Sequence, residues 1–211
     1  MRLASGLGHR TVGPRPLGTD RRRTPFVRFR RFSPPPNITG AGVTMFTTIQ
    51  SFLDTWAHES ASTQKILNAL TDASLAQSVS NDHRTLGRMA WHIAQTLPEM
   101  MHNTGLTVAG VDAHAPVPSS AKTIADGYAA ASASLVKELQ ANWTDATLDT
   151  MDSMYGQQWP RRLTLQVLVM HQNHHRGQMT VLMRQAGLAV PGVYGPAKEE
   201  WGAIGMPSPA I

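Results

Sequence analysis

The stretch from Leu163 to Leu188 (LTLQVLVMHQNHHRGQMTVLMRQAGL) constrains the fold most, because it combines helical periodicity with two regularly spaced histidines. His171 and His175 are four residues apart, so on a helix they lie on one face, about 6 Å apart along the axis. They share that face with Leu168, Gln178 and Leu182. Such a stripe predicts a helix that faces a partner helix or a bundle core.

Polar rings on an apolar helix face need partners, because burying an unpaired polar group is costly. His171 and His175 could be core histidines that are hydrogen-bonded to their neighbours. Alternatively, two imidazoles at this spacing can converge on one metal ion. The spacing alone leaves both readings open, and the metal reading requires a third ligand from elsewhere in the chain.

Composition limits what that ligand can be. The chain has 211 residues, enough for one domain with a sizeable core, and it contains no cysteine. Disulfides, thiolate ligands and a cysteine nucleophile are therefore excluded, which leaves His, Asp and Glu as metal ligands. No run of about 18 apolar residues occurs, so we expect no membrane span.

Residues 1–44 form an Arg- and Pro-rich arm with nine Arg, no Lys and one Asp, while the rest of the chain carries ten basic and thirteen acidic groups. The arm has few large apolar residues, so we expect it to be disordered. It could be an organelle-targeting segment, a nucleic-acid-binding arm, or a translation artefact with Met45 as the true start. We prefer the artefact, because the composition changes abruptly just before Met45.

Four helical stretches are expected after the arm. The first runs from about 47 to 70, the third from about 121 to 141, and the fourth is the histidine-bearing stretch, which Gly187 ends. Asn81 or Asp82 is the expected cap of the second helix, and Pro98 is expected to kink or end it.

The remaining segments are connections. The stretch 144–159 is irregular, and within it residues 148–155 alternate weakly and could form short extended pieces. The tail has a possible short helix at 197–203. We expect Tyr194 and Trp201 to pack this tail across the bundle. Four amphipathic helices without a convincing sheet predict an all-α four-helix bundle, and the long link after the second helix leaves room for a crossover.

The candidates for the third ligand are the other chemistry-bearing side chains near the helices: His58, His83, His92, His102, His114, His174, Glu59 and Glu99. His174 cannot share an ion with His175, because adjacent helical residues diverge by about 100°. His92 lies in the middle of the second helix and faces partly inward. It is therefore the best third ligand by position.

Other polar residues have weaker expected roles. Gln178 could hold a ligand ring or cap a polar layer of the core, with neither reading favoured. Glu59 is expected to be a solvated helix residue and Arg176 a surface residue, although they could act as a general base and an anion-binding group. We assign no role to Glu99, because Pro98 disturbs its geometry relative to His92.

The segments LGRMAWHIA, around His92, and MHQNHHRGQMTVLMRQAGL, together with the closing PGVYGP…EW, resemble the DinB-like (damage-inducible, YfiT-related) superfamily. The resemblance covers about Phe46 to Trp201. It implies an antiparallel four-helix bundle of the up-down-down-up type. It also implies a divalent ion, zinc or nickel, bound by three histidines that match His92, His171 and His175, and a homodimer.

Characterised members of this superfamily include transferases that use small thiols such as bacillithiol or mycothiol, and a thiol-dependent maleylpyruvate isomerase. The resemblance therefore implies a cytoplasmic, metal-dependent transferase or hydrolase that brings a small thiol or water to a small-molecule electrophile. The alternative is a non-catalytic metal-binding stress-response protein. Nucleic-acid binding is not expected of the mildly acidic bundle.

Overall fold

The computed structural model describes residues 46–210, so the expectations for the arm at 1–44 and for the start at Met45 lie outside the described residues. Four helices dominate the described part: α1 (Ile49–Asn68), α2 (Leu86–His102), α3 (Ala121–Asn142) and α4 (Arg161–Gln185). Two short strands, β1 (Met151–Met154) and β2 (Gln157–Pro160), and three 3-10 turns accompany them. The expected all-α architecture is confirmed. None of the described helices is both long and apolar enough to cross a membrane.

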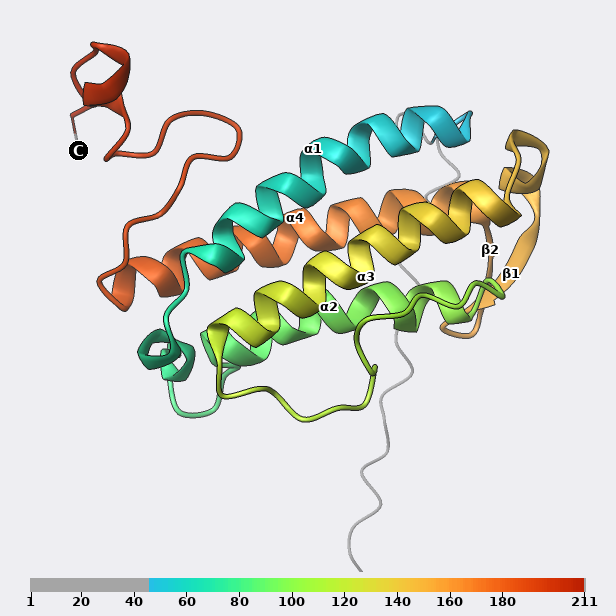
Figure 1. The fold of residues 1–211 in the computed structure, drawn as a ribbon, viewed down its shortest axis with the longest axis horizontal. Helices are drawn as coiled ribbons and strands as arrows, with labels where there is room; N and C mark the ends of the chain where they lie inside the picture. The colour runs from blue at the N-terminus through green and yellow to red at the C-terminus, as the bar shows by residue number, and fades with distance from the viewer. Residues whose placement is uncertain (1–45, 211) are drawn as a thin grey trace, which may run out of the picture. The chain divides into compact units, whose positions relative to one another are not determined.

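The helices form a bundle in which α1 and α4 run one way along the axis and α2 and α3 run the other way (Figure 1). Helix α1 packs against α3 and α4, and α2 packs against the same two helices. The link 103–120 carries the chain back along the bundle, so that α3 begins near the start of α2 (Figure 1). Parallel neighbours need such a long return connection, which the sequence allowed for.

Threonine or serine is the N-cap residue of each of the first three helices. Thr48 accepts a hydrogen bond from the Ser51 amide, Thr85 accepts from the Arg88 amide, and Ser120 accepts from the Thr123 amide. These oxygens satisfy amide groups that have no partner inside the helix. The expected cap at Asn81 or Asp82 is therefore wrong, because the chain is still in a turn there and α2 begins four residues after Asp82.

Helix α2 continues past Pro98 to His102, so the helix does not end at the proline. Proline removes one amide donor from the helical ladder and its ring clashes with the preceding turn, which normally kinks or ends a helix. Here Leu97, Met100 and Met101 are all buried in the core. Their burial holds the last turn in place, and α2 keeps a continuous face from its first turn to His102.

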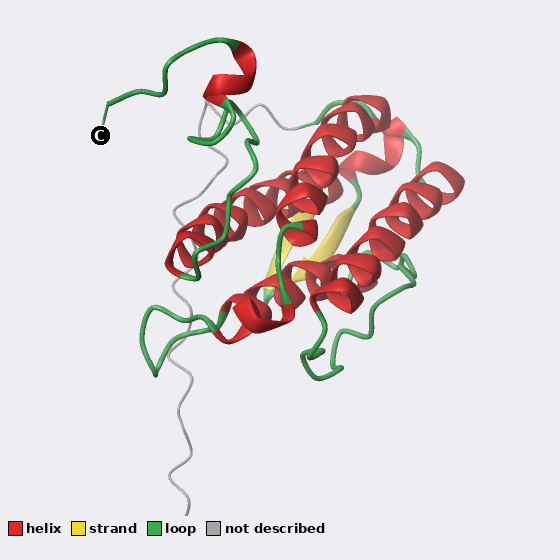
Figure 2. Ribbon diagram, turned by 60° about the vertical axis from the view of Figure 1, so that its left-hand side comes forward, coloured by secondary structure: helices red, strands yellow, loops and turns green. Residues whose placement is uncertain are grey.

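The strands β1 and β2 pair in an antiparallel hairpin at the end of the bundle where α4 begins (Figures 1 and 2). The two-residue turn consists of Tyr155 and Gly156, with φ values of 52° and 82°. Two positive φ angles define the tight hairpin turn that Asn-Gly or Gly-Gly usually occupies. A tyrosine in the left-handed region is uncommon and strained, which suggests that its side chain has a role beyond the turn.

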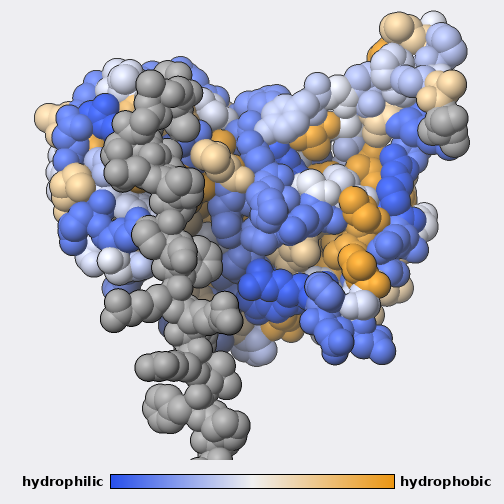
Figure 3. Space-filling view, turned by 180° about the vertical axis from the view of Figure 1, so that it is seen from behind, coloured by the Kyte–Doolittle hydropathy of each residue, from blue (hydrophilic) through white to orange (hydrophobic). Residues whose placement is uncertain are grey.

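One core fills the space between the helices. Its largest fully buried side chains come from all parts of the bundle and include Phe52, Trp56, Leu86, Ile124, Tyr128 and Leu135. The face drawn in Figure 3 is mostly hydrophilic, as expected where polar side chains cover such a core.

The segment after α4 only partly matches expectation. Gly187 has a φ of +74° and ends α4 in the left-handed conformation, as the sequence predicts. The expected short helix is reduced to one 3-10 turn, Trp201–Ile204. Tyr194 reaches the bundle through its hydroxyl group, which donates to Glu59, and through its ring, which lies 5.2 Å from the Arg176 guanidinium carbon, although the residue remains 68% exposed.

Candidate metal centre

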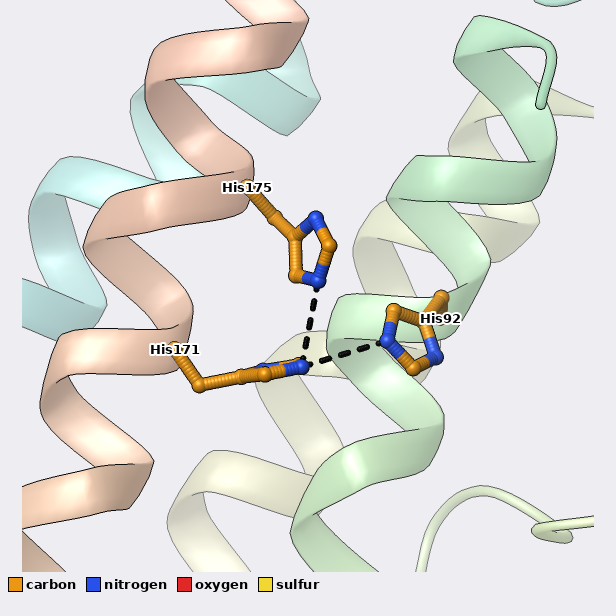
Figure 4. Close-up of side chains that lie close together, drawn as sticks. All are labelled: His92, His171 and His175. Atoms are coloured by element: carbon orange, nitrogen blue, oxygen red, sulfur yellow. Dashed lines mark hydrogen bonds between the residues drawn. The ribbon is translucent and has the colours of Figure 1, made fainter. Parts of the chain in front are cut away.

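His92 from α2 and His171 and His175 from α4 bring their Nε2 atoms together between the two helices (Figure 4). The His171 Nε2 atom is 3.2 Å from that of His92 and 3.1 Å from that of His175. Each ring points toward the other two in Figure 4. The three histidines singled out from the sequence are therefore the three that the fold brings together.

The spacing of these nitrogen atoms fits a metal ion. Zinc binds imidazole nitrogen at about 2.0–2.1 Å, which places two nitrogen ligands of a tetrahedral ion about 3.3 Å apart. The observed separations of 3.1 and 3.2 Å are close to that value. Neutral imidazole nitrogens also suit nickel, copper and iron. The residues thus fit a divalent transition metal.

Hydrogen bonding among the rings explains the cluster less well. His171 Nε2 contacts both other rings, but one imidazole nitrogen carries either one hydrogen or one lone pair. It can therefore make one good hydrogen bond and leaves the second contact unsatisfied. The His171 Nδ1 atom is buried and has no hydrogen-bond partner among the described residues. A shared ion satisfies all three Nε2 atoms at once.

Burial keeps the three rings neutral. Desolvation is the largest cause that lowers the pKa of His92 to about 3 and the pKa of His171 to about 4. The neighbouring histidines and the cationic Arg84 lower both pKa values further. Desolvation also lowers the pKa of His175. Near neutral pH the rings therefore present lone pairs, which is the form that binds metal.

The histidines lie at the edge of the core, because the most buried face of α4 is rotated away from them. Gln172 and Arg176 occupy that face, while His171 and His175 are half-buried and Gln178 is exposed. The predicted stripe therefore runs along the border between core and solvent. His92 and His171 line a cavity of about 390 Å³, through which a small molecule can reach the cluster.

Gln178 holds the third ring. The His175 Nδ1–H group donates to the Gln178 Oε1 atom at 2.8 Å, which leaves the lone pair of His175 on Nε2. A partner of this kind fixes the tautomer and the orientation of a metal-binding imidazole. Of the two roles left open for Gln178, orientation of a ring agrees with this contact, and capping of a buried polar layer does not.

We expect Gln178→Ala to weaken zinc binding about 10- to 100-fold, because loss of such a partner has an effect of that size elsewhere. Competition with a chromogenic chelator measures the change. Gln178→Glu is the matched control, since it retains an oxygen acceptor for the His175 Nδ1–H group. Equal zinc affinity in Gln178→Ala and the wild type would show that Gln178 does not orient the ring.

Glu59 and Arg176 are buried, so both expectations of a solvated side chain are wrong. Arg176 is 3% exposed and Glu59 is 7% exposed. The Arg176 Nη2 atom donates to Glu59 Oε2 at 2.6 Å, and Nη1 donates to Thr63 Oγ1 at 3.1 Å. Tyr194 also donates its hydroxyl to the Glu59 carboxylate at 2.8 Å. These groups form a buried polar network between α1 and α4.

Two neighbours of the cluster were not predicted from the sequence. Gln172 is fully buried and donates to the Ile93 carbonyl at 3.1 Å, which ties α4 to α2 beside His92. Glu99, to which no role was assigned, accepts hydrogen bonds from the Tyr155 hydroxyl at 2.9 and 3.1 Å. An apolar face interrupted by Gln172 was a signal for the first contact, whereas the second depends on a hairpin that the sequence barely indicates.

The remaining candidate ligands do not join the cluster. The side chains of His58, His83, His102, His114 and His174 are exposed. Glu59 is engaged with Arg176 and Tyr194. His174 stacks edge-on against His175 with ring centroids 5.0 Å apart, but it contributes no atom to the group of three nitrogens.

Comparison with known proteins assigns the chain to a family. Residues 45–206 match the DinB family. The chain belongs to the DinB family. It is 51% identical over 167 residues to the uncharacterized protein YrdA of Bacillus subtilis (strain 168), a match that covers 79% of this chain and all of that protein.

A solved DinB-like structure has a similar fold. The crystal structure of a DinB-like protein from Bacillus cereus ATCC 10987 matches with a TM-score of 0.68 and 52% sequence identity. The match covers 71% of this chain and all of the crystallised chain. The resemblance inferred from the motifs around His92 and His171 is thereby confirmed as family membership.

Proposed function

We propose that this DinB-family chain binds one divalent metal ion, zinc or nickel, through the Nε2 atoms of His92, His171 and His175. The observation that supports this most strongly is the convergence of three neutral imidazole nitrogens beside an accessible cavity. Three protein ligands leave at least one position for a guest, which is typical of catalytic rather than structural sites.

We further propose that the protein is a metal-dependent transferase or hydrolase that brings a small thiol or water to a small electrophile. A bound divalent ion lowers the pKa of a coordinated water or thiol and polarises a carbonyl. Gln178 keeps the His175 ring oriented, and the cavity admits the small molecules. The family resemblance also leads us to propose a homodimer that acts in the cytoplasm.

A turnover experiment tests this function. Zinc-loaded and nickel-loaded protein is incubated with a panel of small thiols and an electrophile that releases a coloured group, and then with the electrophile alone. We expect metal-dependent turnover that chelation removes and that His175→Ala lacks, while the fold persists in a thermal melt. The matched control is His174→Ala, because His174 is the exposed neighbour outside the cluster.

The same experiment distinguishes the proposed enzyme from a non-catalytic metal-binding protein. Large destabilisation on chelation, with no turnover of any thiol or water pair, would favour a non-catalytic protein in which the ion stabilises the bundle. Equal rates for loaded protein, chelated protein and His175→Ala would contradict the proposed activity.

A further inference from the structure

The cavity beside the three histidines follows one face of α2 and has opposite charges at its two ends. Its α2 wall includes Arg88, His92 and Glu99, at relative positions of one, five and twelve along the helix. Between Arg88 and Glu99 the helix rises about 16 Å. The cavity lining therefore carries a cation and a carboxylate, and His92 lies between their backbone positions on α2.

A hydrogen bond to Gln95 fixes the Arg88 side chain, which is the positively charged group of the cavity lining. Its Nη2 atom donates to Gln95 Oε1 at 2.8 Å, and within residues 46–210 it has no carboxylate partner. Gln95 is itself 5% exposed and is fixed by its Nε2 atom, which donates to three carbonyl oxygens of the 103–120 link. A guanidinium has five N–H donors in a fixed plane, so among residues 46–210 Arg88 keeps further donors that can bind an anionic group.

Glu99 and Tyr155 form the negative end. Glu99 is half-buried, and its two oxygens accept only the Tyr155 hydroxyl among the described side chains. Tyr155 reaches it from the strained turn position with a φ of 52°. A second cavity of about 360 Å³ adjoins the first at Glu99 and Ala113, so there is room for a group beside this carboxylate.

We propose that this groove binds an elongated zwitterion, with an acidic group at Arg88, a protonated amine at Glu99 and Tyr155, and a metal-binding donor atom between them. An extended tripeptide spans about 10 Å, which is shorter than the rise between Arg88 and Glu99, and the Arg88 side chain shortens that separation because it runs along α2 toward Gln95. The inference deepens the proposed function and rests on it only for the central donor. The charged ends require no metal.

The peptide Gly-Cys-Gly is the probe, with its N-acetylated and C-amidated forms and with Gly-Ser-Gly. Binding is measured by calorimetry to zinc-loaded and to chelated full-length protein. Because a charge-assisted hydrogen bond at a partly exposed site contributes modestly, we expect each blocked end to weaken binding about tenfold. In Glu99→Gln, acetylation of the peptide amine should weaken binding less than about twofold, while amidation of the carboxylate should still weaken it about tenfold. In Arg88→Gln, amidation should lose its effect and acetylation should keep it.

Asp126→Asn is the control variant, since Asp126 is an exposed α3 carboxylate paired with Lys122, and it retains both effects. The proposal is overturned if the dissociation constant of Gly-Cys-Gly from the wild type is above about 10 mM, which corresponds to a binding free energy near −3 kcal/mol. It is also overturned if the blocked forms bind equally or if the variants keep both preferences. Dependence on the ends without any preference for cysteine over serine would support the two charged ends, but it would contradict both the central metal-binding donor and the proposed thiol chemistry.

Discussion

His171→Ala is expected to weaken zinc binding about 100- to 1,000-fold. A structural zinc site contributes roughly 10–16 kcal/mol through four ligands, so one ligand accounts for about 2.5–4 kcal/mol. His171 should show the full effect, because its Nε2 atom lies within 3.2 Å of both other Nε2 atoms. Zinc competition with a calibrated chelator and metal analysis of the purified protein measure the change.

The matched control for this prediction is His174→Ala. It removes an imidazole from the same helix, three residues away, without touching the group of three nitrogens. We expect the zinc affinity of His174→Ala to stay within about twofold of the wild type, a difference under 0.5 kcal/mol. An equal loss in both variants would mean that the cluster is not the metal site.

Glu59→Ala should have the largest effect on stability. It leaves the Arg176 guanidinium buried without its carboxylate, and breaking a buried ion pair from one side costs about 3–5 kcal/mol. Chemical unfolding, followed by circular dichroism, gives the free energy of unfolding. The exposed pair of Lys122 and Asp126 is the comparison, since its removal by Asp126→Asn should cost less than about 1 kcal/mol.

A double variant shows whether the loss comes from the unpaired charge. Adding Arg176→Met to Glu59→Ala removes the buried cation, so the double variant should be more stable than Glu59→Ala alone. If Glu59→Ala is no less stable than Asp126→Asn, the buried network does not contribute to the stability of the fold.

The sequence predicted the parts of this structure that depend on local periodicity. The regular apolar spacing indicated α1, α3 and α4 to within a few residues, and Gly187 marked the end of α4. The cap of α2 was misplaced because several short polar residues precede it, and only the fold selects Thr85. At Pro98 the buried side chains around the proline outweighed its local preference.

The site shows the same division between local and long-range information. His171 and His175 were predictable from their spacing, and His92 from its place in a helix and from the family motif. The pairing of Glu59 with Arg176 joins residues 117 positions apart and leaves no local signal, so each residue seemed to be solvated when considered alone. Arg88 and Glu99 line one cavity in the folded chain because Ala113 of the 103–120 link and Tyr155 of the hairpin complete its wall. Those contacts are long-range and leave no signal in the sequence of α2.

X-ray absorption at the zinc edge of the loaded wild-type protein is the most direct test of the central claim. We expect one zinc per chain, with three imidazole nitrogens at about 2.0–2.1 Å and at least one further light atom. Absence of a stoichiometric ion, or a coordination shell without imidazole scattering, would contradict it.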